Sequence, residues 1–171
     1  RLGVRAITVK ATYGTGTSLM ALTPNRVRST QGISSTIAWS QAGQVQHALE
    51  GNISVSGQTA AFTAELLGLP DAAALSALAE TVPDSNGVAF VPALVGLGAP
   101  HWRSDARGTI TGMTLGTKPA HLARAALEAI AFQVADVYAA MEADIGTALG
   151  EIRADGGAAR NDLLMQFQAD I

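Results

Sequence analysis

Two glycine-rich segments that also carry hydroxyl, amide and carboxylate side chains lie far apart in the chain. One covers residues 12–18, with the sequence TYGTGTS, and the other covers residues 155–161, with the sequence DGGAARN. Glycines let a backbone approach a polyphosphate closely, and neighbouring amides and threonine hydroxyls can donate hydrogen bonds to phosphate oxygens. A single glycine-rich turn is usually only a turn, but the two segments together favour a nucleotide-binding lobe.

The overall composition restricts the other functions open to the chain. Eleven Lys and Arg residues against fourteen Asp and Glu residues give a formal net charge of -3, so the basic surface of a nucleic-acid-binding protein is missing. The chain has no cysteine, which excludes disulfides and thiolate zinc sites. No apolar stretch is long enough to span a membrane, and no signal peptide is evident. We expect a cytoplasmic protein with no nucleic-acid or membrane partner.

Strands are predicted in the first third of the chain. Apolar or β-branched runs at residues 5–12 and 19–23 flank the first glycine-rich segment, which places its hydroxyls at the tip of a tight loop. Runs at residues 32–39 and 44–50 predict a second hairpin joined by a short loop.

Helices dominate the remainder. Residues 58–67 form a short helix with Ala61, Phe62, Leu66 and Leu67 as its apolar positions, and Asp71 is a fair N-cap for a helix over residues 72–82. The clearest helix is predicted over residues 119–144, where apolar residues recur at three- and four-residue steps before Gly146. Arg124 and Glu128 lie one turn apart on its other face, and Glu128 and Asp136 are expected to be helix-surface or interhelix charges.

Three further strands separate or follow these helices. The run at residues 87–94 predicts a buried strand, residues 108–115 alternate as a second strand, and residues 151–154 form a short strand that leads into a last helix. This order favours an α/β fold with helices packed on a mixed sheet. Ligands bind such sheets at the carboxyl ends of strands, which is where residues 155–161 lie.

Several segments in this order resemble the FGGY carbohydrate kinases, and within that family the glycerol kinase branch. Residues 12–16 are similar to the phosphate loop, residues 91–102 to a glycerol kinase stretch, residues 108–128 to the second family signature, and residues 155–168 to the adenosine motif with its helix. The resemblance implies an actin-like, ribonuclease-H-like lobe, here an incomplete domain. Residues 1–171 would be part of the C-terminal nucleotide-binding domain of a two-domain kinase, with the N-terminal sugar domain and the final residues absent.

The resemblance also implies which residues bind the nucleotide. Gly14 and Thr15 would hydrogen-bond the phosphates, Gly57 would border the nucleotide, Gly157 would allow close approach of the backbone, and Asn161 would contact the adenosine end. The parent enzyme would transfer the γ-phosphoryl group of ATP to a hydroxyl of a sugar or polyol, with Mg held mainly through phosphates and water. Such kinases often form homo-oligomers.

The sequence departs from the family pattern at a nucleotide contact, at an acceptor contact and at the catalytic base. Ala61 stands where glycerol kinases carry a Gln, so the resemblance does not carry that nucleotide contact over to this chain. Ser18 stands where they carry a Phe against the glycerol carbons, and a serine leaves more room and offers a hydrogen bond, which favours a larger acceptor. Residues 1–11 contain no acidic residue, so we expect the base aspartate upstream of Arg1 and no activity from residues 1–171 alone.

Other interpretations remain open at this stage. The segment could be a non-catalytic ATP-sensing or scaffold domain, for which loss of a Gly-Asp segment shortly before Arg1 would be the sign, or an actin-like ATPase, which the match at residues 96–102 disfavours. Asp155 could orient the glycine turn or lie near the nucleotide and Mg. His101 and Trp102 are expected to pack or form an interface. The three histidines, which are His47, His101 and His121, do not have the spacing of a metal site.

Overall fold

The computed structural model describes residues 7–171, and its first four strands form two consecutive hairpins. They are β1 (Ile7–Tyr13), β2 (Thr17–Thr23), β3 (Ser34–Gln41) and β4 (Gln44–Ile53). Both predicted hairpins are confirmed, although residues 5 and 6 of the first predicted strand lie outside the described residues. The second loop is shorter than predicted, because Ala42 and Gly43 both adopt positive φ and close a two-residue turn.

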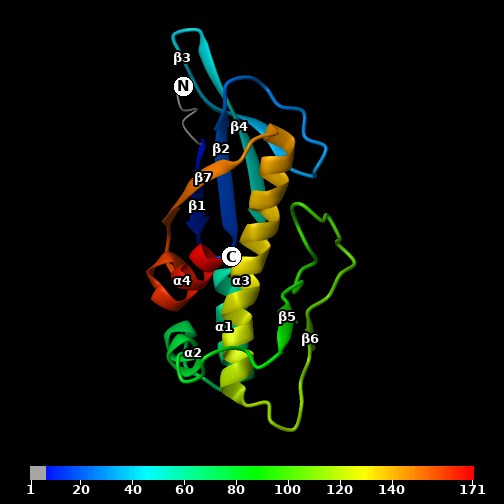
Figure 1. Ribbon diagram of the computed structural model, residues 1–171, viewed down its shortest axis with the longest axis vertical. Coiled ribbons are helices and arrows are strands. Elements are labelled where there is room, and N and C mark those ends of the chain that lie inside the picture. Colours follow the sequence, from blue (N-terminus) through cyan, green and yellow to red (C-terminus); the bar gives the residue numbers. More distant parts are fainter. Residues whose placement is uncertain (1–6) are drawn as a thin grey trace.

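The main sheet is mixed, as predicted, with the strand order β3-β4-β2-β1-β7 (Figure 1). Strands β3, β4, β2 and β1 pair with one another in antiparallel fashion, and β7 (Leu149–Asp155) pairs in parallel with the other side of β1. Thr12 of β1 is the register partner of Asp155 of β7. Parallel strands end at the same edge of a sheet, so this pairing brings the two glycine-rich segments together.

Four α-helices accompany the sheet, and their ends follow the sequence signals. They are α1 (Gly57–Leu66), α2 (Ala72–Ala79), α3 (Pro119–Ile145) and α4 (Asp162–Asp170), the last preceded by a 3-10 turn at Ala158–Arg160. The Asp71 side chain accepts a hydrogen bond from the Ala74 amide at 2.8 Å, which confirms the predicted cap. Gly146 ends α3 in the left-handed conformation, also as predicted. None of the helices in residues 7–171 is long and apolar enough to cross a membrane.

Helix α3 lies along the main sheet and continues beyond it to α1 and α2 (Figure 1). Its predicted apolar stripe is buried at Ala126, Ile130 and Val134, but every residue from 125 to 131 is buried as well, because α1, α2 and α4 pack around this half. Of the two alternatives predicted for Glu128, a helix-surface or an interhelix charge, its burial excludes the first. Its side chain is 11% exposed and accepts a hydrogen bond from Arg124 Nε at 2.8 Å, which compensates the buried charge.

Helix α1 buries the face opposite to the predicted one. Phe62 and Leu66 are 41% and 60% exposed, while Ala60 and Ala64 are buried. Small side chains let two helices approach closely, and α1 uses this face against α3.

The segments predicted as two longer strands form a separate two-stranded sheet beside α3 (Figure 1). Strand β5 (Ala89–Val91) pairs with β6 (Thr109–Thr111), and both are shorter than predicted. The prediction that the strand at residues 87–94 is buried is wrong, since Val91 of β5 is 43% exposed. The hairpin packs on α3 with one face only, which leaves the other face in solvent.

The long connection between β5 and β6 is attached to the main body by the two aromatic residues expected to pack. His101 Nε2 lies 3.0 Å from Asp136 Oδ2 on α3, and Trp102 Nε1 donates to the Gly32 carbonyl at 2.6 Å. Both side chains remain exposed apart from these polar contacts, with Trp102 at 61%, so the expectation that they pack or form an interface stays a prediction. Asp136 is half-exposed, as expected of a helix-surface charge.

Candidate functional site

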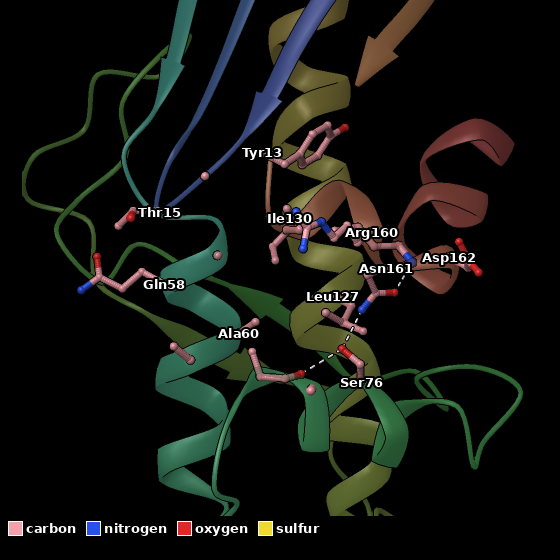
Figure 2. Close-up of a pocket in the computed structure, with 18 of the residues that line it drawn as sticks. Tyr13, Thr15, Gln58, Ala60, Ser76, Leu127, Ile130, Arg160, Asn161 and Asp162 are labelled. Atoms are coloured by element: carbon pink, nitrogen blue, oxygen red, sulfur yellow. Dashed lines mark hydrogen bonds between the residues drawn. The ribbon is translucent and has the colours of Figure 1, made fainter. Parts of the chain in front are cut away.

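One large cavity lies where β1 and β7 end. It has a volume of about 940 Å³, within the range of small-molecule sites, and its walls come from the first glycine-rich loop, α1, α2, α3 and the segment before α4 (Figure 2). All five residues predicted to bind nucleotide line it, and these are Gly14, Thr15, Gly57, Gly157 and Asn161.

The loop between β1 and β2 is bonded directly to the start of α1. The Thr15 carbonyl accepts from the amides of Ser56 and Gln58 at 2.8 and 3.2 Å, and the Gly14 carbonyl accepts from the Gly57 amide at 3.0 Å. Loop carbonyls thus satisfy the first helical amides, which have no side-chain cap. With its carbonyls engaged, the loop is held with Gly14 and Thr15 exposed at the cavity.

Gly57 is required by the contact between α1 and the loop. A Cβ atom at this position would lie 2.6 Å from the Gly14 carbonyl oxygen, closer than such atoms can approach. Gly16 is equally constrained, because its Cβ would lie 2.4 Å from the Ile53 carbonyl oxygen. Glycine at these positions therefore sets the path of the loop.

The second glycine-rich segment contains one strained glycine and one open glycine. Gly156 has a φ of +97°, and a Cβ there would lie 2.4 Å from the Tyr13 carbonyl oxygen. Gly157 has an ordinary helical φ of -63°, and a Cβ there would meet no atom within 4 Å. Gly157 is the glycine predicted to allow close approach of the backbone, and it is open at the cavity, whereas the position whose backbone requires glycine is Gly156.

Asn161 is the N-cap of α4, and both ends of its amide are engaged (Figure 2). Its Oδ1 accepts from the Leu164 amide at 2.9 Å, and its Nδ2 donates to Ser76 Oγ at 2.6 Å. Asn before a helical run signals a cap, but nothing in the sequence pointed to Ser76, which is 85 residues away.

The deep wall of the cavity combines one tyrosine with apolar side chains. Tyr13 is fully buried, and its hydroxyl donates to Gln168 Oε1 on α4 at 2.9 Å. Burial raises the pKa of Tyr13 far above its ordinary value, so the hydroxyl stays a neutral donor. Leu127, Ile130 and Ala61 also line the cavity, and at Ala61 a methyl group stands where the resembled kinases have an amide.

Asp155 and Ser18 lie outside the residues that line this cavity. The Thr12 hydroxyl holds the pKa of the exposed Asp155 carboxyl below its ordinary value, with a smaller contribution from Lys10, whose Nζ lies 3.5 Å away. The contacts of Asp155 are thus with β1 rather than with the glycine turn. Ser18, on β2 just beyond the loop, donates from Oγ to Glu50 Oε1 at 3.2 Å.

Within residues 7–171, no three imidazole or carboxylate groups converge as metal ligands would.

Comparison with protein families gives one match over nearly the whole chain. The model of the FGGY family of carbohydrate kinases, C-terminal domain, matches residues 9–171. Glycerol kinases of Burkholderia cenocepacia and Chromobacterium violaceum are 54% and 52% identical to the chain over 165 residues. Each alignment covers 95% of this chain and 33% of the relative, so the chain spans about a third of the length of the curated relatives it matches.

Solved structures give the same result for the fold. Plasmodium falciparum glycerol kinase with ADP superposes with a TM-score of 0.87 at 38% identity, covering 94% of this chain and 33% of that chain. Xylulose kinase from Rhodospirillum rubrum superposes with a TM-score of 0.81 at 28% identity, covering 98% and 33%. The expected actin-like ATPase lobe, a mixed sheet flanked by helices, is confirmed by these neighbours.

Proposed function

The chain belongs to the FGGY family of carbohydrate kinases, whose C-terminal domain it matches, and from this we propose that it supplies the nucleotide-binding lobe of a two-domain, ATP-dependent kinase. The enzyme would phosphorylate a hydroxyl of a sugar or polyol, as expected of a glycerol kinase-like protein. The convergence of the five predicted nucleotide-binding residues on one cavity carries the proposal.

The geometry suits a phosphate chain that enters along the first loop. Gly14 and Thr15 are exposed at the cavity on a backbone held by α1. The Gly14 amide already donates to the Gly16 carbonyl at 2.8 Å, so the Thr15 amide and hydroxyl are the donors that this loop preorganises for phosphate oxygens. The exposed Gly157 would leave room for the ribose or α-phosphate, and Asn161, which lines the same cavity, would contact the adenosine end. Magnesium, when bound with the nucleotide, would neutralise phosphate charge.

Acceptor recognition is proposed to involve the Ser18–Glu50 pair. Ser18 follows the phosphate loop by two residues, so an acceptor hydroxyl aimed at the γ-phosphate would lie near it. A hydroxyl bonded to a carboxylate provides polar partners for a polyhydroxylated substrate. A homo-oligomeric state remains a prediction of the family resemblance, and a cytoplasmic location remains a prediction from composition.

The deciding experiment measures ADP release by the full-length chain with MgATP and a panel of glycerol, ketoses and longer polyols. We expect acceptor-dependent ADP release, and Ser18→Phe should lower kcat/KM for acceptors longer than glycerol by about tenfold relative to glycerol, because the ring fills the space that serine leaves. Ser18→Ala, which removes the hydrogen bond without filling the space, is the matched control.

Two results would contradict these proposals. ATP binding without turnover of any acceptor would indicate the sensor or scaffold interpretation instead of the kinase. An equal effect of Ser18→Phe on all acceptors would remove Ser18 from acceptor selection. Residues 1–171 alone, which we expect to be inactive, serve as the negative control.

A further inference from the structure

We propose that Ser76 is a positioning residue that orients Asn161 at the adenosine end of the nucleotide site. The inference rests on the proposed kinase function and deepens it. Ser76 lies on α2 and Asn161 caps α4, and both line the cavity (Figure 2). Their side chains meet at 2.6 Å, from Asn161 Nδ2 to Ser76 Oγ.

The hydrogen-bond network leaves each side chain a single role. The Ser76 hydroxyl donates its proton to the Ala72 carbonyl at 2.9 Å, so towards Asn161 it can act only as an acceptor. The Asn161 Oδ1 is committed to the Leu164 amide at 2.9 Å. Asn161 must therefore turn its amino group to Ser76, and the second Nδ2 hydrogen keeps no acceptor among the described residues. That hydrogen is available to a nucleoside.

The same bond fixes the wall of the cavity. Among the described residues it is the one side-chain hydrogen bond that joins α2 to the N-cap of α4, and the other α2 residues at the cavity are Ala72, Ala73 and Ala77. Alanine side chains fill space but provide no directional contact. Ser76 thus holds α2 in register with the α4 N-terminus, on which the Asn161 amide depends.

A positioning role predicts a selective loss of nucleotide affinity in the full-length kinase. Ser76→Ala should raise KM for ATP about tenfold, the value of one hydrogen bond, and leave kcat and the acceptor KM within about twofold. Ser76→Thr keeps the hydroxyl and should restore KM for ATP to near the wild-type value. A residue that only stabilises α2 would instead change the thermal stability and lower kcat for every substrate.

A double-mutant cycle separates Ser76 acting through Asn161 from Ser76 acting alone. Asn161→Asp keeps the oxygen that caps α4 but removes the donor to Ser76, so Ser76→Ala added to Asn161→Asp should change KM for ATP by less than about twofold. Independent, multiplying effects would overturn the proposal, and so would an unchanged KM in Ser76→Ala. Absence of acceptor-dependent ADP release in the wild-type enzyme would instead refute the proposed function.

Discussion

Gly57→Ala is expected to lower kcat/KM for MgATP by about 100-fold in the full-length kinase without unfolding the lobe. The added Cβ would lie 2.6 Å from the Gly14 carbonyl oxygen, so the phosphate loop must move by several tenths of an ångström. A catalytic loop displaced on this scale loses its alignment with the transferred phosphoryl group. Helix α1 itself tolerates the change, because Ala is a better helix former than Gly.

Gly116→Ala is the matched control, because a Cβ there meets its nearest atom, Thr114 Oγ1, at an ordinary 3.6 Å. Steady-state kinetics with a saturating acceptor and a thermal melt of each variant make the comparison. If Gly57→Ala kept both the melting temperature and kcat/KM of the wild type, the loop at Gly14 and Thr15 would not position the nucleotide.

Gly156→Ala is expected to destabilise the lobe by about 3 kcal/mol, because a positive φ and an overlap with the backbone of Tyr13 both oppose a side chain there. Gly157→Ala should leave stability unchanged, since its Cβ meets no atom within 4 Å. Its methyl group would instead occupy cavity space and raise the Kd of ADP about tenfold. Alanine substitutions at these two neighbouring glycines should therefore have different effects, one on stability and the other on ADP affinity.

Hydrogen exchange followed by mass spectrometry locates the destabilisation by Gly156→Ala, which should speed exchange in peptides of β1 and β7. Isothermal titration calorimetry with ADP measures the loss of ADP affinity expected for Gly157→Ala. Tight ADP binding by Gly157→Ala, with unchanged exchange, would place the nucleotide away from this turn.

Local signals predicted the elements of this lobe well. The Asp71 cap, the Gly146 terminus and the apolar period of α3 all reappear in the structure, because each depends on neighbours within a turn or two. The glycine-rich segments were also predictable as a pair, since each follows a strand and carries its own donors.

Burial and long-range pairing could not be predicted in the same way. The spacing of apolar residues predicted that Phe62 lies in the core, yet the buried face of α1 consists of the small residues Thr59, Ala60, Thr63 and Ala64. The burial of Arg124 and Glu128 depends on three other helices, which a periodic pattern on α3 does not contain. The Ser76–Asn161 bond likewise exists only after α2 and α4 have docked.

Helix α3 is a single uninterrupted strut about 40 Å long, from its 27 residues. Near its carboxyl end, Asp144 accepts hydrogen bonds from the Ser29 hydroxyl and from the Thr30 amide, the latter at 2.8 Å, and its other half is wedged between α1, α2 and α4. Because α3 is held by contacts in both of its halves, it cannot bend independently of the elements around it. In the proposed two-domain kinase, we therefore expect this lobe to move as one rigid piece during any closure of the cleft.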